Sequence, residues 1–161
     1  MNEFLTMLLG ASPVLELRGA IPIAMGIFRF TAAEAYFWSV LGNFLPVIPA
    51  LLVLYKLSNF LTQKSFFFNR FFGWLFRYTR DKHQQKFDYH HHHHWRPLLE
   101  FWALFVFVAI PLPFTGAWSG SVVAFVFGIP IWRAALAIGL GVLTSGLIVL
   151  AAIKGIVALP F

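Results

Sequence analysis

The stretch PVLELRGAIP, residues 13–22, interrupts a long apolar run near one end of this chain. A second interruption, IPLPFTGAW, residues 110–118, lies near the other end. Proline and glycine break both runs, because proline removes a helix hydrogen bond and clashes with the preceding turn. We predict that the two stretches are the tips of re-entrant helical hairpins that meet at mid-membrane. One uninterrupted helix over residues 3–30 is the alternative.

The composition indicates an integral membrane protein. Of 161 residues, 60% are hydrophobic and 11% are charged, against about 45–50% and about 25% in soluble domains. Cysteine is absent, so disulfides and thiolate metal sites are not expected. We predict one transmembrane domain over residues 1–161, multi-pass in the cell (inner) membrane.

Short and long apolar segments alternate along the chain. Helices too short to cross about 30 Å of hydrocarbon are predicted over residues 3–12, 19–30, 98–110 and 117–128. Spanning helices are predicted over residues 33–57, kinked at Pro46 and Pro49, and from Pro130 through Lys154. Each hairpin is therefore followed by one spanning helix.

Residues 58–97 have a different character, because aromatic residues alternate there with bases. Eight of the twelve basic residues lie between Lys56 and Arg96. We predict an amphipathic segment that lies on anionic headgroups, on the cytoplasmic side by the positive-inside rule. The run of His90, His91, His92, His93 and His94 is interpreted as a solvated loop tip or an inserted tag that binds metal adventitiously at most. A regulatory metal site is the alternative.

The chain also aligns with itself at an offset of 97 residues. Glu3 then falls on Glu100, Gly19-Ala20 on Gly116-Ala117, and Gly42 on Gly139. A hairpin returns to its own face and the next helix crosses once, so the second repeat starts on the opposite face. The predicted fold is an all-α membrane protein with two inverted repeats, residues 1–57 and 98–161, joined by residues 58–97. Such repeats with broken helices are typical of transporters, and both termini are expected outside.

The motifs ELRGAIP, residues 16–22, and PLPFTGAWSG, residues 111–120, resemble the paired motifs of the small multidrug export family. The resemblance covers nearly all of the chain outside residues 58–97, although Phe114 stands where the family pattern often has glycine. The family is similar in fold to the DedA/VTT membrane proteins, which include lipid-phosphate translocases and scramblases. The resemblance implies an exporter and supplies no substrate.

The two tips are the predicted binding site. Helix N-termini and the planar guanidinium of Arg18 favour phosphate or carboxylate, and a buried Glu16 beside Arg18 is suited to proton coupling. The alternatives are that Glu16 and Arg18 form a structural ion pair and that Asn43 only packs. The predicted substrate- or ion-binding residues are Glu16, Arg18, Gly19, Pro22, Asn43, Pro111, Pro113, Thr115, Gly116 and Ser119.

We therefore predict a secondary transporter, proton-linked, for an amphipathic or anionic small molecule. A lipid or polyprenyl-phosphate translocase or scramblase of DedA type is the alternative, and a non-transporting assembly factor is the second. No enzyme signature is present, so neither catalysis nor a cofactor is expected. The expected partner is the lipid bilayer, with no nucleic acid, and a homodimer is compatible with the sequence.

Overall fold

The computed structural model describes residues 1–64, 96–112 and 115–158. These residues form helices and connections, with no strand among them: α1 (Asn2–Ala11), α2 (Glu16–Gly26), α3 (Ala32–Phe44), α4 (Val47–Lys64), α6 (Arg96–Ala109), α7 (Ala117–Val126) and α8 (Ile131–Ala158). The all-α prediction is confirmed for this part of the chain.

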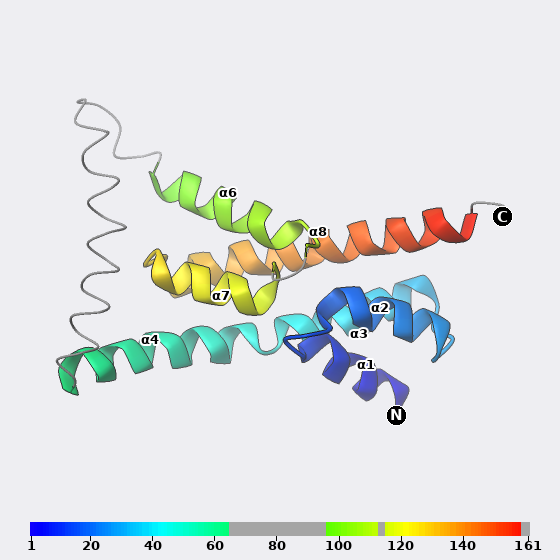
Figure 1. The fold of residues 1–161 in the computed structure, drawn as a ribbon, viewed down its shortest axis with the longest axis horizontal. Helices are drawn as coiled ribbons and strands as arrows, with labels where there is room; N and C mark the ends of the chain where they lie inside the picture. Colours follow the sequence, from blue (N-terminus) through cyan, green and yellow to red (C-terminus); the bar gives the residue numbers. More distant parts are fainter. Residues whose placement is uncertain (65–95, 113–114, 159–161) are drawn as a thin grey trace.

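Two helical hairpins dominate the arrangement. In Figure 1, α1–α2 and α6–α7 open toward opposite ends of the molecule, and their turns face each other near its middle. The alternative of one helix over residues 3–30 is wrong, because Ser12–Leu15 separate α1 from α2. The first tip is also shorter than predicted.

Pro22 explains that difference. It lies inside α2, so Arg18, Gly19 and Pro22 are helical rather than part of an extended tip. The fixed φ angle of proline is close to the helical value. The missing N–H of Pro22 removes only one helix hydrogen bond, the one to the carbonyl of Arg18. The helix therefore continues through Pro22, and the break is left to the turn around Pro13.

The first long apolar segment is divided by proline, as predicted. A capping box opens α3: the Thr31 hydroxyl accepts from the Glu34 N–H at 3.3 Å, and the Glu34 carboxylate accepts from the Thr31 N–H at 2.9 Å. The α3 helix ends at Phe44 and α4 starts at Val47, so the break falls at Leu45-Pro46. Pro49 stands in the first turn of α4, where a missing N–H is tolerated.

The α4 helix runs on to Lys64. Residues 58–64 of the predicted amphipathic linker are therefore a continuation of α4. Residues 65–95 of that linker, with the histidine run, lie outside the described residues.

The long helix α8 is the centre of the packing. It contacts α2, α3, α4, α6 and α7, and it begins directly after Pro130, as predicted. Its buried side chains include Ala134, Ile138 and Val142. The pairs α1–α3 and α6–α8 make the most extensive helix contacts, so the first helix of each hairpin packs on the long segment that follows it.

Helices α1 and α3 approach closely enough for backbone contact. A Cβ added to Gly42 would meet the backbone carbonyl oxygen of Met7 and would lie 2.6 Å from its Cα. A Cβ added to Gly10 would lie 2.5 Å from the carbonyl oxygen of Ser39. Small residues at such crossings are how helices associate in lipid, where the solvent is as apolar as leucine.

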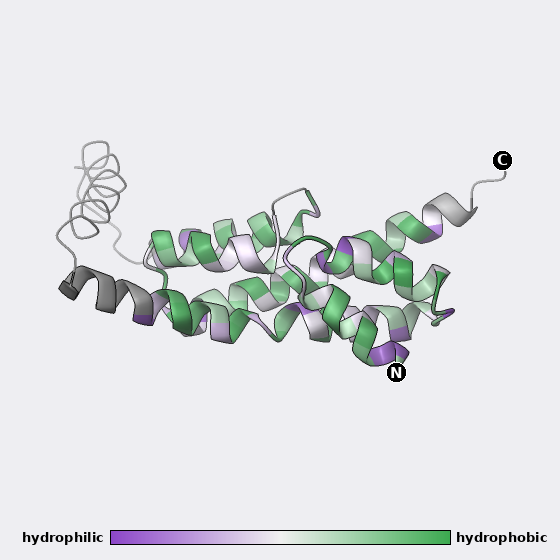
Figure 2. Ribbon diagram, turned by 60° about the horizontal axis from the view of Figure 1, so that its bottom comes forward, coloured by the Kyte–Doolittle hydropathy of each residue, from purple (hydrophilic) through white to green (hydrophobic). Residues whose placement is uncertain are grey.

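The outer surface is apolar along the length of the molecule. Two stretches, Ala32–Lys56 and Ile131–Gly155, are long and apolar enough to cross a membrane. Only 28% and 39% of the most apolar part of each stretch is buried by the rest of the protein. The core helix of a soluble protein, in contrast, is mostly buried. Leu99, Trp102 and Trp132 are more than half exposed. Figure 2 shows hydrophilic residues mainly near the ends of the helices and at the turns. Lipid is the solvent that fits this surface.

Each hairpin is followed by a left-handed residue. Arg29 has φ +59° after α2, and Gly128 has φ +68° after α7. Only glycine adopts this conformation without steric cost. We expect Arg29→Gly to stabilise the protein by about 1 kcal/mol and Gly128→Ala to destabilise it by a similar amount. Thermal unfolding in detergent measures both, and opposite shifts of Tm are required; equal shifts would contradict the assigned backbone conformations.

Candidate functional site

The turn of the first hairpin is closed by Ser12. Its hydroxyl accepts from the Leu15 N–H at 3.1 Å, and its carbonyl accepts from the Glu16 N–H at 3.2 Å. Serine side chains favour turns for this reason. Glu16 follows in the left-handed region with φ +47°, a conformation that costs about 1–3 kcal/mol in a residue other than glycine. The strained backbone conformation therefore occurs at Glu16, the acidic residue that lies between the two hairpins.

The connection of the second hairpin is held by Thr115. Its hydroxyl accepts from the Leu112 N–H at 3.0 Å and lies 2.6 Å from the carbonyl oxygen of Ile110. Ser119 caps the following helix, because its hydroxyl accepts from the Gly116 N–H at 2.9 Å. The hydroxyls of Thr115 and Ser119 are therefore both used within this hairpin.

The two turns are joined by side chains of the first. The Arg18 guanidinium donates to the backbone carbonyl of Thr115. The Glu16 carboxylate lies 3.6 Å from the Arg18 guanidinium, between Nη2 and Oε2, and packs directly on Gly116, where a Cβ would overlap it. The predicted residues Glu16, Arg18, Thr115 and Gly116 thus form one contact, here called the tip contact.

Trp118 adds a bond in the other direction. Its indole N–H donates to the carbonyl of Ala11 at 3.0 Å, at the end of α1. The Glu16 carboxylate lies against Gly116, the N-cap residue of α7, and the start of a helix is a favourable place for a carboxylate. Trp118 was not among the predicted site residues, although it lies in the second motif, residues 110–118.

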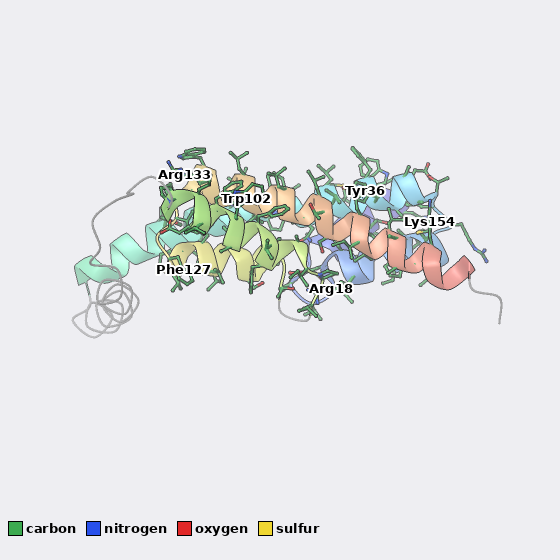
Figure 3. All side chains as sticks on the ribbon, turned by 90° about the horizontal axis from the view of Figure 1, so that it is seen from above. Arg18, Tyr36, Trp102, Phe127, Arg133 and Lys154 are labelled. Carbon is green, nitrogen blue, oxygen red and sulfur yellow. The ribbon has the colours of Figure 1, made fainter. Side chains whose placement is uncertain are left out.

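The electrostatics of the tip contact are unbalanced toward positive charge. Helices α2 and α7 both begin at the tip contact, and the N-terminus of each helix carries a partial positive charge. The Arg18 side chain is 29% exposed and that of Glu16 is 11% exposed. Arg18 has five N–H donors, and its exposure leaves some of them accessible to an anionic group. Figure 3 places Arg18 near the middle of the long axis, with Arg133 and Lys154 toward opposite ends.

Asn43 is not part of the tip contact. It lies in α3, 2% exposed, beside Gly10 of α1. Ser39, one turn earlier, is fully buried. Neither the Ser39 hydroxyl oxygen nor the Asn43 side-chain oxygen has a hydrogen-bond partner among the described residues. Sequence reasoning missed Ser39, and its spacing of four residues from Asn43 is the signal that identifies it.

The other predicted residues that the structure describes are not part of the tip contact. Gly19 packs against Leu15, the residue before α2, and Pro22 is exposed on that helix. Pro111 lies half-buried in the connection before Thr115, and Pro113 lies outside the described residues. Glu16 and Arg18 both belong to α2, so this part of the predicted tip over residues 13–22 is helical.

Comparison with known proteins identifies one family. The family model described as "Putative small multi-drug export protein" matches residues 16–148. The match begins at Glu16, directly after the first turn, and includes the second turn. Neither a curated protein nor a solved structure matches this chain.

Proposed function

Because this chain belongs to the small multi-drug export protein family, we propose that it exports a small molecule that binds at the tip contact. The observation that carries the proposal is the bond from Arg18 to the Thr115 carbonyl beside the buried Glu16. Burying an acid and a base between two helical hairpins of a membrane protein costs free energy. Such residues therefore usually mark a functional site. The description of the family names export, which supports the proposal, and enzymatic activity forms no part of it.

We further propose that the hairpins are re-entrant and that the two repeats are inverted. Helices α1, α2 and α7 have 10, 11 and 10 residues, which is about 15 Å of helix each, and α6 has 14 residues, which is about 21 Å. Half of a hydrocarbon layer of about 30 Å has the depth of the three shorter helices. Two such hairpins that enter from opposite faces would meet at the midplane, where transporter sites are built from broken helices.

The substrate class follows from the charges. Arg18 and two helix N-termini favour an anionic or amphipathic molecule with a carboxylate or phosphate group. Glu16 is the acid next to this position, and we assign it the coupling proton. A proton taken up by Glu16 would weaken its attraction to Arg18 and to the start of α7, which would release both for the substrate.

The translocase alternative uses the same chemistry on a different substrate. A lipid or polyprenyl-phosphate headgroup would also bind the Arg18 fork, as in a DedA-type translocase or scramblase. In the assembly-factor alternative the tip contact is only structural. The assay below separates the three.

The test is transport by the purified protein in liposomes that contain a pH-sensitive dye. Cationic drugs, anionic amphipaths and labelled lipid phosphates are added in turn, with and without a pH gradient. We expect substrate-dependent proton movement with an anionic amphipath. Flipping of lipid phosphate without a pH response would favour the translocase, and inactivity with every compound would overturn transport.

The topology can be tested separately. We expect residues 58–97 in the cytoplasm and both termini outside, because the bases are concentrated in that segment. The chain has no cysteine, so single cysteines at positions 2 and 85 can be labelled in intact cells with an impermeant reagent. Position 2 should react and position 85 should not. Labelling of position 85 from outside would contradict this topology.

A further inference from the structure

The polar pair Ser39 and Asn43 is the strongest unexplained feature outside the tip contact. The two side chains stand one turn apart on the buried face of α3, at 0% and 2% exposure. The Ser39 Oγ and the Asn43 Oδ1 have no hydrogen-bond partner among the described residues. Buried polar atoms are nearly always paired, so two unpaired oxygens on one helix face indicate a bound species.

The break between α3 and α4 adds further oxygens at the same place. Pro46 has no N–H for the carbonyl of Gly42, and Pro49 has none for the carbonyl of Leu45. The last backbone bond into α3 from the break runs from the Leu45 N–H to the Leu41 carbonyl, at 3.1 Å. The C-terminal end of α3 therefore presents carbonyl oxygens without their helical donors, next to Asn43.

The C-terminal end of α1 also lies beside Asn43 and adds partial negative charge there. A Cβ added to Gly10 would lie 3.3 Å from the Asn43 backbone nitrogen, and α1 ends one residue later at Ala11. Helix C-termini carry a partial negative charge. Two of them thus lie beside Asn43. Arg18, the base of the tip contact, is directed to Thr115 and Glu16.

We propose that Asn43, Ser39 and the carbonyl oxygens freed by Pro46 and Pro49 bind a monovalent cation such as Na⁺. The oxygens are neutral, and no cluster of three acidic, histidine or cysteine side chains occurs in the described part of the chain. Divalent cations usually take carboxylate ligands, whereas unwound carbonyls and helix C-terminal ends are suited to Na⁺. The site is separate from the proposed substrate site, and it does not depend on transport.

The test is cation-dependent thermal stability of the full chain in detergent, with N-methylglucamine chloride replacing NaCl at constant ionic strength. We expect a saturable rise of Tm with Na⁺, because a ligand of the folded state stabilises it. Asn43→Ala and Ser39→Ala should each raise the half-saturating Na⁺ concentration about tenfold, as expected when one ligand is lost. Ser121→Ala is the matched control, since Ser121 is equally buried but its hydroxyl bonds to the Ala117 carbonyl at 2.8 Å.

A further variant excludes a purely structural role for the polar pair. Pro46→Ala restores the N–H donor to the Gly42 carbonyl, so it should leave the Na⁺-free Tm equal or higher while it weakens the response to Na⁺. An equal Tm of the unsubstituted protein in NaCl and in N-methylglucamine chloride would overturn the proposal. Buried water would then be the occupant of the site. An unchanged Na⁺ response in Asn43→Ala or Pro46→Ala would overturn it as well. Because no substrate is present, these outcomes are independent of whether the protein transports.

Discussion

Arg18→Gln is expected to reduce transport at least about tenfold while the protein still inserts and folds. The substitution removes the charge-assisted bond to the Thr115 carbonyl and the only base beside Glu16 in the tip contact. Hydrogen bonds to charged groups contribute about 1.5–3 kcal/mol, and 1.4 kcal/mol corresponds to about a factor of ten. Arg18→Lys keeps the charge but loses the planar fork, so transport should fall in this variant as well. The measurement is initial rate in liposomes.

Arg133→Gln is the matched control for charge. Arg133 lies over the ring of Trp132, 5.1 Å from its centroid, in the first turn of α8 and far from the tips. Its loss should leave the transport rate unchanged.

A structural role for the pair has a different signature. If Glu16 and Arg18 only hold the hairpins together, Arg18→Gln should lower Tm in detergent, because it leaves a buried carboxylate without its base. The double variant Glu16→Gln with Arg18→Gln should then recover stability. Recovery of transport together with stability in the double variant would end the proposal that this pair binds substrate or proton.

Gly42→Ala is expected to destabilise the protein strongly. The new Cβ would meet the backbone of Met7, which cannot move away as a flexible side chain can. We expect a loss of about 3 kcal/mol, at the upper end for overpacking, with a low yield of folded protein. Thermal unfolding in detergent and gel filtration measure it.

Gly26→Ala is the control, because a Cβ at Gly26 has no heavy atom within 4 Å. That variant should keep its Tm or gain slightly, since alanine favours helix. Equal Tm values for the two variants would show that α1 and α3 cross at a greater distance.

The sequence was sufficient to predict the hairpins because proline and glycine act locally. Pro130 precedes a helix as expected, and Pro46 separates α3 from α4 where a kink was expected. Pro22 does not break its helix, because a helix tolerates one missing bond when its flanking turns are packed, and α2 buries Leu17, Ala20 and Ile21. Packing of this kind depends on α3 and α8, which the local sequence does not contain.

The candidate site was predictable only in part. Glu16 and Arg18 are visible in sequence as charges in an apolar run. Thr115 and Gly116 were predicted as well, but the sequence does not show that they meet Arg18 and Glu16 through their backbone rather than their side chains. The same limit applies to Ser39, whose burial and missing partner exist only after α1 has packed on α3.

The bond from Arg18 to Thr115 has a consequence for the symmetry of the proposed repeats. The two residues are 97 positions apart, which is the offset that superimposes the proposed repeats. Equivalent points of two halves related by a twofold rotation can touch only on the rotation axis. Under the proposed inverted repeats, the contact between Arg18 and Thr115 therefore lies on the axis that relates the two halves, so both halves contribute equivalent positions to it.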